Sequence, residues 1–277
     1  VKHIVRAAEK VMEGDFSARI GKIRSIDPND GFNTIIDYFN RMTEELSHTE
    51  TLRTDFIANV SHEIKTPLAV MQNYGTMLQQ PSLSEEKRME YAKAITDASR
   101  LLAEMVTNIL KLNKLENQTL YPSARTYDLG EQLCACLLGF EDLWEDKNLD
   151  IQTEIQENVR VTADPELLSL VWNNLFSNAI KFTEPGGAVS QVLATEGDQA
   201  VVMVSDTGCG ISQEVGKHIF EKFYQGDTSH AAKGNGLGLA LVKRVIDITR
   251  GDIQVSSQVG KGSTFTVKLR REKDEKV

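Results

Sequence analysis

In the first half of the chain, the apolar residues recur every three or four positions, which is the period of an amphipathic helix. This period predicts a short helix over residues 1–13 and a connector over 14–31 that is rich in turn-forming residues. A second helical pattern covers about residues 32–78 and contains Pro67. Because proline has no N–H to close the hydrogen-bond ladder, we expect this helix to bend there.

A third helical pattern follows a turn at residues 79–84. Its apolar residues are Ile95, Leu101, Leu102, Met105, Ile109, Leu112 and Leu115. Two long helices joined by a short turn predict an antiparallel hairpin. The apolar face of each helix is too wide for one partner, so we expect two copies of the chain to pair as a four-helix bundle.

After residue 122 the apolar residues alternate, which is the period of a strand. The pattern predicts strands at 149–155, 159–161, 189–192, 200–204, 253–255 and 263–269, separated by helices at about 129–147, 165–181, 212–221 and 236–250. The fold class is therefore multidomain, with N-terminal helices followed by an α+β sandwich domain. In that domain, helices are expected to cover one face of a mixed sheet.

Composition narrows the class of protein. Hydrophobic residues make up 40% of the chain and charged residues 26%, as in an ordinary globular protein. The formal net charge of -9 leaves no basic surplus for phosphates, which argues against nucleic acid as the main partner. The three cysteines are too few for a disulfide framework, so we expect reduced thiols. No run of 18 apolar residues is present that would span a membrane.

One histidine lies on the polar side of the second helix. The apolar stripe of that helix consists of Phe56, Val60, Ile64, Leu68, Met71 and Leu78. His62 is two residues from Val60 and from Ile64, a rotation of roughly 200°, so its imidazole is expected to point outward. An exposed imidazole can act as a nucleophile, and Glu63 beside it can take a proton from the ring. A solvated surface pair is the alternative for a His-Glu pair that stands alone.

Three polar residues share one face of the helix expected at 165–181. Asn174, Asn178 and Lys181 are four and three positions apart. Amide oxygens suit Mg²⁺ and an ammonium group suits phosphate oxygens, so this face fits a metal-bound polyphosphate. A solvated helix face is the alternative.

Three glycine-containing segments complete the pattern. Asp206 ends a buried strand, where it could accept from an exocyclic amine while the following glycines let the backbone approach a flat ring. A glycine cluster at 234–238 opens an apolar helix, whose free N–H groups attract phosphate. This cluster is neither a dinucleotide fingerprint nor a Walker A loop. The last segment, 260–264, is a tight hairpin, and each segment by itself could be an ordinary turn.

All of these motifs, in this order, resemble the sensor histidine kinases of two-component signalling. What look like the family's boxes are the H box at His62, the N box at Asn174–Lys181, the G1 box at Asp206–Gly210, the F box at Phe220–Phe223, the G2 box at Gly234–Gly238 and the last glycine box at Gly260–Thr264. The resemblance covers about residues 50–270.

The resemblance implies ATP and Mg²⁺ as cofactors and transfer of the γ-phosphoryl group to His62. Glu63 would accept or orient the proton of His62, and Thr66 would aid dephosphorylation of a response regulator. Asn178 would be the Mg²⁺ ligand. The residues that would bind the nucleotide are Asn174, Asn178, Lys181, Phe182, Asp206, Gly208, Gly210, Lys233, Gly234, Gly236, Leu237, Gly238 and Thr264.

It also implies three domains: a HAMP-like signal relay at 1–46, a dimerisation and phosphotransfer hairpin at 47–120, and a catalytic ATP-binding domain at 121–277. The expected partners are a second copy of the chain and the aspartate of a cognate response regulator. The chain starts with Val1 inside a helical pattern, and in the family the relay follows a transmembrane helix. The chain is therefore expected to be the cytoplasmic portion of a bacterial cell-membrane protein.

Two alternatives stay open. An ATPase of the same nucleotide fold, such as gyrase or a mismatch-repair protein, would lack the hairpin that carries His62. A non-catalytic relay or a phosphatase-biased protein is the second alternative. Relatives often have arginines where Gln225 and His230 stand, and Lys233 lacks the arginine fork for the terminal phosphates. This departure concerns the rate of a kinase more than ATP binding.

Overall fold

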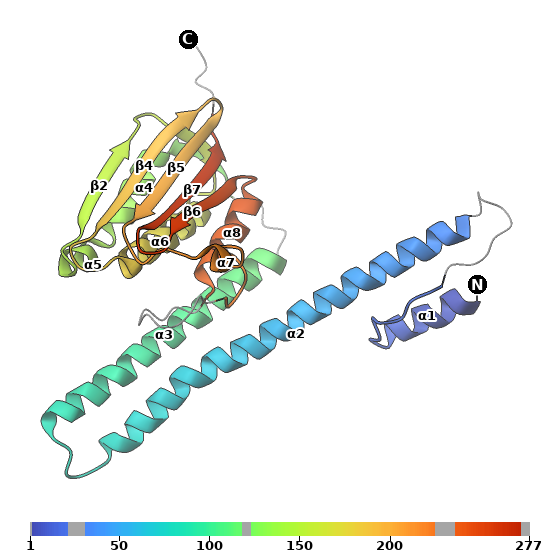
Figure 1. Cartoon of the computed structure of the whole chain (residues 1–277), viewed down its shortest axis with the longest axis horizontal. Helices are drawn as coiled ribbons and strands as arrows, with labels where there is room; N and C mark the ends of the chain where they lie inside the picture. The colour runs from blue at the N-terminus through green and yellow to red at the C-terminus, as the bar shows by residue number, and fades with distance from the viewer. Residues whose placement is uncertain (1, 22–30, 118–122, 225–235, 273–277) are drawn as a thin grey trace. The chain divides into compact units, whose positions relative to one another are not determined.

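The computed structural model describes residues 2–21, 31–117, 123–224 and 236–272 (Figure 1). It consists of two compact units, Val1–Lys65 and Thr66–Val277, which are described separately below. Among the described residues, no helix has the length and hydropathy needed to cross a membrane.

The first unit contains α1 (Lys2–Met12) and most of α2 (Gly31–Leu78), as the helical period predicts. Its small core is formed by Ala7, Ile20 and Ile36, with Ile4 and Phe39 packed against them. The side chain of Asn40 accepts from the N–H of Ile20 and donates to the carbonyl of Ile20, both at 2.9 Å. This pair of bonds satisfies the backbone of Ile20 as a neighbouring strand would, and it holds that residue against α2.

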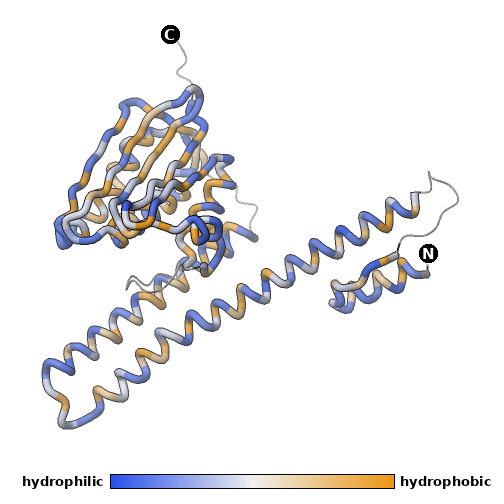
Figure 2. The backbone as a smooth tube through the Cα atoms, in the orientation of Figure 1, coloured by the Kyte–Doolittle hydropathy of each residue, from blue (hydrophilic) through white to orange (hydrophobic). Residues whose placement is uncertain are grey.

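In the second unit, the end of α2 and α3 (Glu85–Asn117) flank the turn at 79–84, where the sequence predicts it. Apolar and polar residues alternate along both helices (Figure 2). Leu68 of the predicted stripe is 43% exposed in the single chain, whereas Pro67 beside it is buried. An exposed apolar residue on this helix is what the pairing of two hairpins into a four-helix bundle would cover.

The C-terminal end of α3 is held by residues of the sheet-containing domain. The guanidinium group of Arg244 donates twice to the carbonyl of Leu115, at 3.0 and 3.2 Å. Lys222 forms an ion pair with Glu116 at 2.5 Å. Cations near the last turn of a helix satisfy its free carbonyls and suit its dipole.

The domain after α3 is built on a mixed five-stranded sheet, as predicted. The strands are β2 (Asp150–Ile155), β4 (Ala188–Glu196), β5 (Gln199–Asp206), β7 (Gly262–Arg270) and β6 (Asp252–Gln258), in that spatial order. β2 pairs with β4 in parallel, and the other pairs are antiparallel. β3 (Arg160–Ala163) pairs instead with β1 (Arg125–Asp128), a strand that the sequence pattern did not predict because Tyr127 is its one apolar residue.

The helices of this domain are α4 (Leu129–Leu138), α5 (Glu141–Asp146), α6 (Pro165–Phe182), α7 (Gln213–Gly216) and α8 (Gly238–Ile248). The single helix predicted at 129–147 is wrong, because Gly139 and Phe140 separate α4 from α5. Of the helix predicted at 212–221, only the four residues of α7 are helical. α6 begins where its sequence indicates: Asp164 accepts from two N–H groups of the first turn, and Pro165 follows it.

The core lies between the sheet and the helices on one of its faces, with α4 and α6 seen behind the strands (Figure 1). α6 contributes Trp172 and Phe176, both fully buried. Buried residues alternate along β4 and β7 and include Val189, Leu193, Phe265 and Val267, whereas in β5 the successive residues Ala200, Val201 and Val202 are all buried. This alternation leaves the second face of the sheet more exposed and confirms the predicted fold class.

One polar side chain breaks this apolar layer. Gln191 lies in β4 between Val189 and Leu193 on the helix-facing side, and it is 1% exposed. Neither its amide nitrogen nor its amide oxygen has a hydrogen-bond partner within the described residues. An unsatisfied buried amide destabilises the folded state by about 1–3 kcal/mol.

Gln191→Leu should therefore raise the free energy of unfolding of this domain by about 1–3 kcal/mol, because it removes the unsatisfied amide at similar volume. Both tryptophans of the chain, Trp144 and Trp172, lie in this domain, so denaturant unfolding followed by tryptophan fluorescence reports on it. Gln199→Leu is the matched control at an exposed position of the next strand. A lower unfolding midpoint in Gln191→Leu would contradict this explanation.

Candidate functional site

The last two turns of α6 present the three polar residues that the sequence singles out. Asn174, Asn178 and Lys181 are half-buried, while Ala179 and Ile180 between them are buried. Burial lowers the pKa of the Lys181 ammonium group, and the negative charge of Glu104 opposes this shift. The C-terminal half of α6 is therefore amphipathic, and the three side chains on its polar face are partly shielded from water.

Phe182 directly follows this face and ends α6. The ammonium nitrogen of Lys181 lies 5.2 Å from the centroid of its ring, which is cation–π distance. The carbonyl of Phe182 lies so close to Gly208 that any β-carbon at position 208 would collide with it. The end of the N-box helix and the G1 loop are thus in direct backbone contact, which glycine alone permits.

Asp206 is the last residue of β5, two positions before Gly208. Burial raises the pKa of its carboxyl group, and hydrogen bonds from the N–H groups of Gly208 and Ser263 oppose the shift. The bond from Gly208 measures 2.9 Å. Position 262 is also closed to side chains, because Gly262 (φ +112°) packs its Cα against the carbonyl of Asp206. The G1 loop is therefore enclosed between the end of α6 and the hairpin before β7.

The F box and the G2 box meet at a second close backbone contact. The N–H of Phe223 donates to the carbonyl of Gly236 at 2.9 Å. Gly236 has a φ of +63°, and a β-carbon there would lie 2.7 Å from the Phe223 backbone. Leu237 is fully buried, and Gly238 begins α8 beside the side-chain oxygen of Asn174. The start of α8 is thus placed next to the N-box helix.

Two of the remaining candidates, Thr264 and Gly210, lie around the same end of the sheet. Thr264 donates its hydroxyl to the hydroxyl of Ser205 at 2.9 Å. Gly210 (φ +70°) packs against the carbonyl of Gln258. Lys233 and Gly234, like Gln225 and His230, lie outside the described residues, so the expectations that concern them stay predictions.

His62, in the unit Val1–Lys65, points into solvent as predicted, with its side chain 82% exposed. Its Nδ1 lies 3.9 Å from Oε1 of Glu63, within ion-pair distance but beyond hydrogen-bonding distance. Thr66 follows one turn later on α2 and is exposed. Pro67 lies inside the helix immediately after it.

Lys147 is a residue of this region that the sequence analysis missed. Its ammonium group donates to the carbonyls of Ile180, Lys181 and Thr183, each at 2.9 Å. These acceptors are backbone atoms more than 30 residues away, so no spacing or motif in the sequence indicates the contact.

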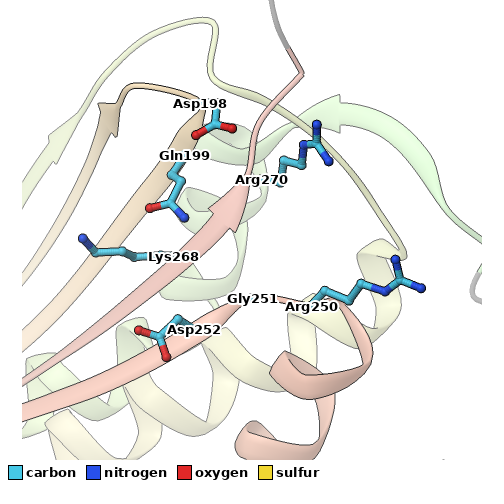
Figure 3. A pocket seen from close by; sticks show the side chains of 7 residues that line it. All are labelled: Asp198, Gln199, Arg250, Gly251, Asp252, Lys268 and Arg270. Atoms are coloured by element: carbon cyan, nitrogen blue, oxygen red, sulfur yellow. The ribbon is translucent and has the colours of Figure 1, made fainter.

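Two hollows lie on the surface of the second unit. One lies at the end of β5 opposite Asp206 and contains none of the candidates; it is lined by Asp198, Gln199, Arg250, Gly251, Asp252, Lys268 and Arg270 (Figure 3). Both signs of charge line it, so it favours neither an anion nor a cation. The other, about 420 Å³, lies between α3 and α6 and includes Asn174.

A divalent cation at this site would depend on neutral oxygen ligands. Among the described residues, no group of three or more His, Cys, Asp or Glu side chains could hold a metal ion. The amide oxygen of Asn178 together with phosphate oxygens is a donor set that suits Mg²⁺, which usually keeps few protein ligands in nucleotide sites. The residues present therefore fit a nucleotide-bound Mg²⁺.

Two family models match the chain. Residues 52–118 match the His Kinase A (phospho-acceptor) domain. Residues 163–273 match the histidine kinase-, DNA gyrase B-, and HSP90-like ATPase domain. The first match covers the segment that carries His62, and the second covers the N, G1, F and G2 boxes. A gyrase-type ATPase would lack the first match.

Curated relatives agree with both models. The circadian input-output histidine kinase CikA of Synechococcus elongatus is 38% identical over 220 residues, which are 77% of this chain and 29% of CikA. The heme sensor protein HssS of Staphylococcus aureus is 32% identical over 272 residues, which are 97% of this chain and 57% of HssS. The chain thus spans between 29% and 57% of the length of these relatives.

Among solved structures, histidine kinase ThkA in complex with response regulator protein TrrA aligns with a TM-score of 0.69. The alignment covers 86% of this chain and 68% of ThkA at 20% identity, so it establishes the shared fold. Together, the phospho-acceptor and ATPase models and the relatives show that the chain belongs to the sensor histidine kinases. The ATPase match also indicates that its α+β domain binds ATP.

Because burial raises the pKa of Asp206, its carboxylate should become protonated at a higher pH than an exposed aspartate. Asp206 is expected to accept from the adenine amine, and a neutral carboxyl group is a weaker acceptor than a carboxylate. ATP affinity should therefore fall several-fold as the pH drops through this raised pKa, and recover above it. Calorimetric titration of ATP across the acidic range measures the effect.

Asp206→Asn is the control for this pH dependence. Its affinity for ATP should be lower at neutral pH, by about 1–3 kcal/mol, and the loss of affinity at acidic pH should disappear. An acidic loss of equal size in Asp206→Asn would assign it to the nucleotide instead.

Proposed function

We propose that the chain transfers the γ-phosphoryl group of ATP to His62 and then to an aspartate of a response regulator. The observation that carries this proposal is the exposed imidazole of His62 with Glu63 beside its Nδ1. Solvent exposure lets the ring reach both a nucleotide and a partner protein. The family membership supports both steps.

The first step needs a neutral imidazole with its proton on Nδ1. Nε2 then supplies the electron pair that forms the P–N bond, while the bond between the γ-phosphorus and the bridging oxygen breaks and ADP leaves. Glu63 takes the Nδ1 proton from the cation that results. In the second step, the phosphoryl group passes from Nε2 to the regulator carboxylate, and the P–N bond breaks.

The other candidates would bind and neutralise the nucleotide, which is most of what phosphoryl transfer requires. Asp206 would accept from the adenine amine, and Asn178 would hold Mg²⁺, whose charge offsets that of the phosphates. Asn174 and Lys181 would contact the phosphates. The residues proposed around them are Phe182, Gly208, Gly210, Lys233, Gly234, Gly236, Leu237, Gly238 and Thr264.

We extend the proposal to the partners and the domains. The exposed apolar residues of the two long helices, Met89, Val106 and Leu110 among them, support a homodimer through residues 47–120. The ThkA complex with TrrA, on the same fold, supports a response regulator as the second partner. The two hydrogen bonds between Asn40 and Ile20, which hold the first unit together, support a HAMP-like relay at 1–46. Residues 121–277 would be the catalytic domain. The family resemblance supports a cytoplasmic location beside a bacterial membrane.

His62→Gln should abolish acid-labile labelling by γ-labelled ATP, because it removes the attacking nitrogen. Nucleotide affinity should stay within about threefold of wild type, under about 0.7 kcal/mol. The chain has five histidines, so His48→Gln, at an exposed position of the same helix, is the matched control and should keep its label. Label that persists in His62→Gln would show that His62 is not the phosphoacceptor. Release of free phosphate without labelling of the protein would indicate an ATPase.

Thr66 is proposed to act in a separate phosphatase reaction on the regulator. It lies one helical turn after His62, and its hydroxyl can orient a water molecule toward an aspartyl phosphate docked over that turn. Thr66→Ala should slow regulator dephosphorylation tenfold or more, about 1.4 kcal/mol in the barrier, and keep most autophosphorylation. Loss of both activities together would show that Thr66 is structural, and Thr66→Ser should retain both.

A further inference from the structure

The C-terminal end of α6 is bound by the ammonium group of Lys147, the residue that caps α5. Lys147 follows the last residue of α5 and is half-buried. An ammonium group has three N–H donors, and here they meet three carbonyls at 2.9 Å, those of Ile180, Lys181 and Thr183. The positive charge also suits the negative end of the α6 dipole.

Without Lys147, two carbonyls of the last turn would lack these donors. The final carbonyls of a helix have no partner within it. At the end of α6, Ala179 is satisfied by the N–H and the hydroxyl of Thr183. Ile180 and Lys181 receive the ammonium group of Lys147 instead. The carbonyl of Phe182, the last residue of the helix, faces Gly208 in the G1 loop.

The backbone around Lys147 strengthens this connection. The carbonyl of Lys147 accepts from the N–H of Gly186 at 3.0 Å, and the N–H of Asp150 donates to the carbonyl of Gly187 at 2.8 Å. The turn after α5 is therefore joined to the turn after α6 on both sides of the ammonium group. A side chain anchored in this way can fix the position of the helix end.

We propose that Lys147 is a positioning residue for nucleotide binding, which holds the last turn of α6 so that the side chain of Lys181 faces the phosphates. The inference rests on the ATP site proposed above. Lys147 binds the carbonyl of Lys181 directly, and the G1 loop contacts the same turn at the carbonyl of Phe182. Loss of the ammonium group removes its hydrogen bonds to the carbonyls of Ile180 and Lys181 and lets the turn that carries Lys181 fray.

The test is a double-mutant cycle on the full chain, with the affinity for Mg²⁺-ATP measured by calorimetry. Lys147→Met keeps the aliphatic stem and removes the donors. It should weaken binding fivefold or more in the wild-type background and less than twofold in the Lys181→Ala background. Lys268→Met, which removes a lysine that donates to Glu196 at 2.8 Å, is the matched control and should bind within twofold of wild type.

The outcomes separate this inference from the proposed function. Absence of ATP binding by the wild-type chain would overturn the ATP site and this inference with it. If wild type binds ATP and Lys147→Met binds equally well, only the role of Lys147 is refuted. An equal loss in both backgrounds would also refute it, since a purely structural role does not act through Lys181.

Tryptophan fluorescence shows whether each variant is folded. If Lys147→Met is unfolded, Lys147→Arg decides, because a guanidinium group keeps a donor charge at the helix end but its planar fork cannot serve three oxygens from one point. Lys147→Arg should lose two- to threefold in ATP affinity in the wild-type background and none in the Lys181→Ala background. Full affinity in Lys147→Arg together with an unfolded Lys147→Met would assign Lys147 to stability alone and overturn the inference.

Discussion

The proposed nucleotide-binding end of the α+β domain depends on backbone segments that approach one another too closely for any side chain. Gly208 lies against the carbonyl of Phe182, and Gly262 lies against the carbonyl of Asp206. These contacts place the end of α6, the end of β5 and the start of β7 at one point. The position of the Asp206 carboxylate is thus set by steric exclusion more than by any single hydrogen bond.

Much of the fold follows from the period of the apolar residues. The long helices, the turn at 79–84 and the six main strands are strongly periodic, and the structure has them where the pattern indicates. The errors occur where the local signal is short or divided. β1 (Arg125–Asp128) has Tyr127 as its one apolar residue, so no alternation marks it, and Gly139 with Phe140 interrupts an otherwise continuous helical pattern.

Only part of the candidate site could be predicted from the sequence. Spacing alone places Asn174, Asn178 and Lys181 on one helix face, and the rotation from the apolar stripe exposes His62. The contacts of Gly208 and Gly238 are tertiary, so the sequence shows that glycine is present but not what it must avoid. Lys147 is less accessible still, because its partners are carbonyl groups that every residue carries. A side chain that binds backbone carbonyls needs no particular residue type at the acceptor positions, so the spacing of residue types does not predict the contact.

The pairing of β5 with β7 has a consequence for how such chains can vary. Between Asp206 and Gly262 the chain forms α7, α8 and β6 and includes residues 225–235. The entropy cost of closing a loop grows with the logarithm of its length, about 0.6 kcal/mol for each doubling. A longer or shorter segment between Asp206 and Gly262 would therefore change the cost of pairing β5 with β7 by little, and the two strands could keep their register. Related chains can thus differ in the length of this segment without refolding the sheet that carries Asp206.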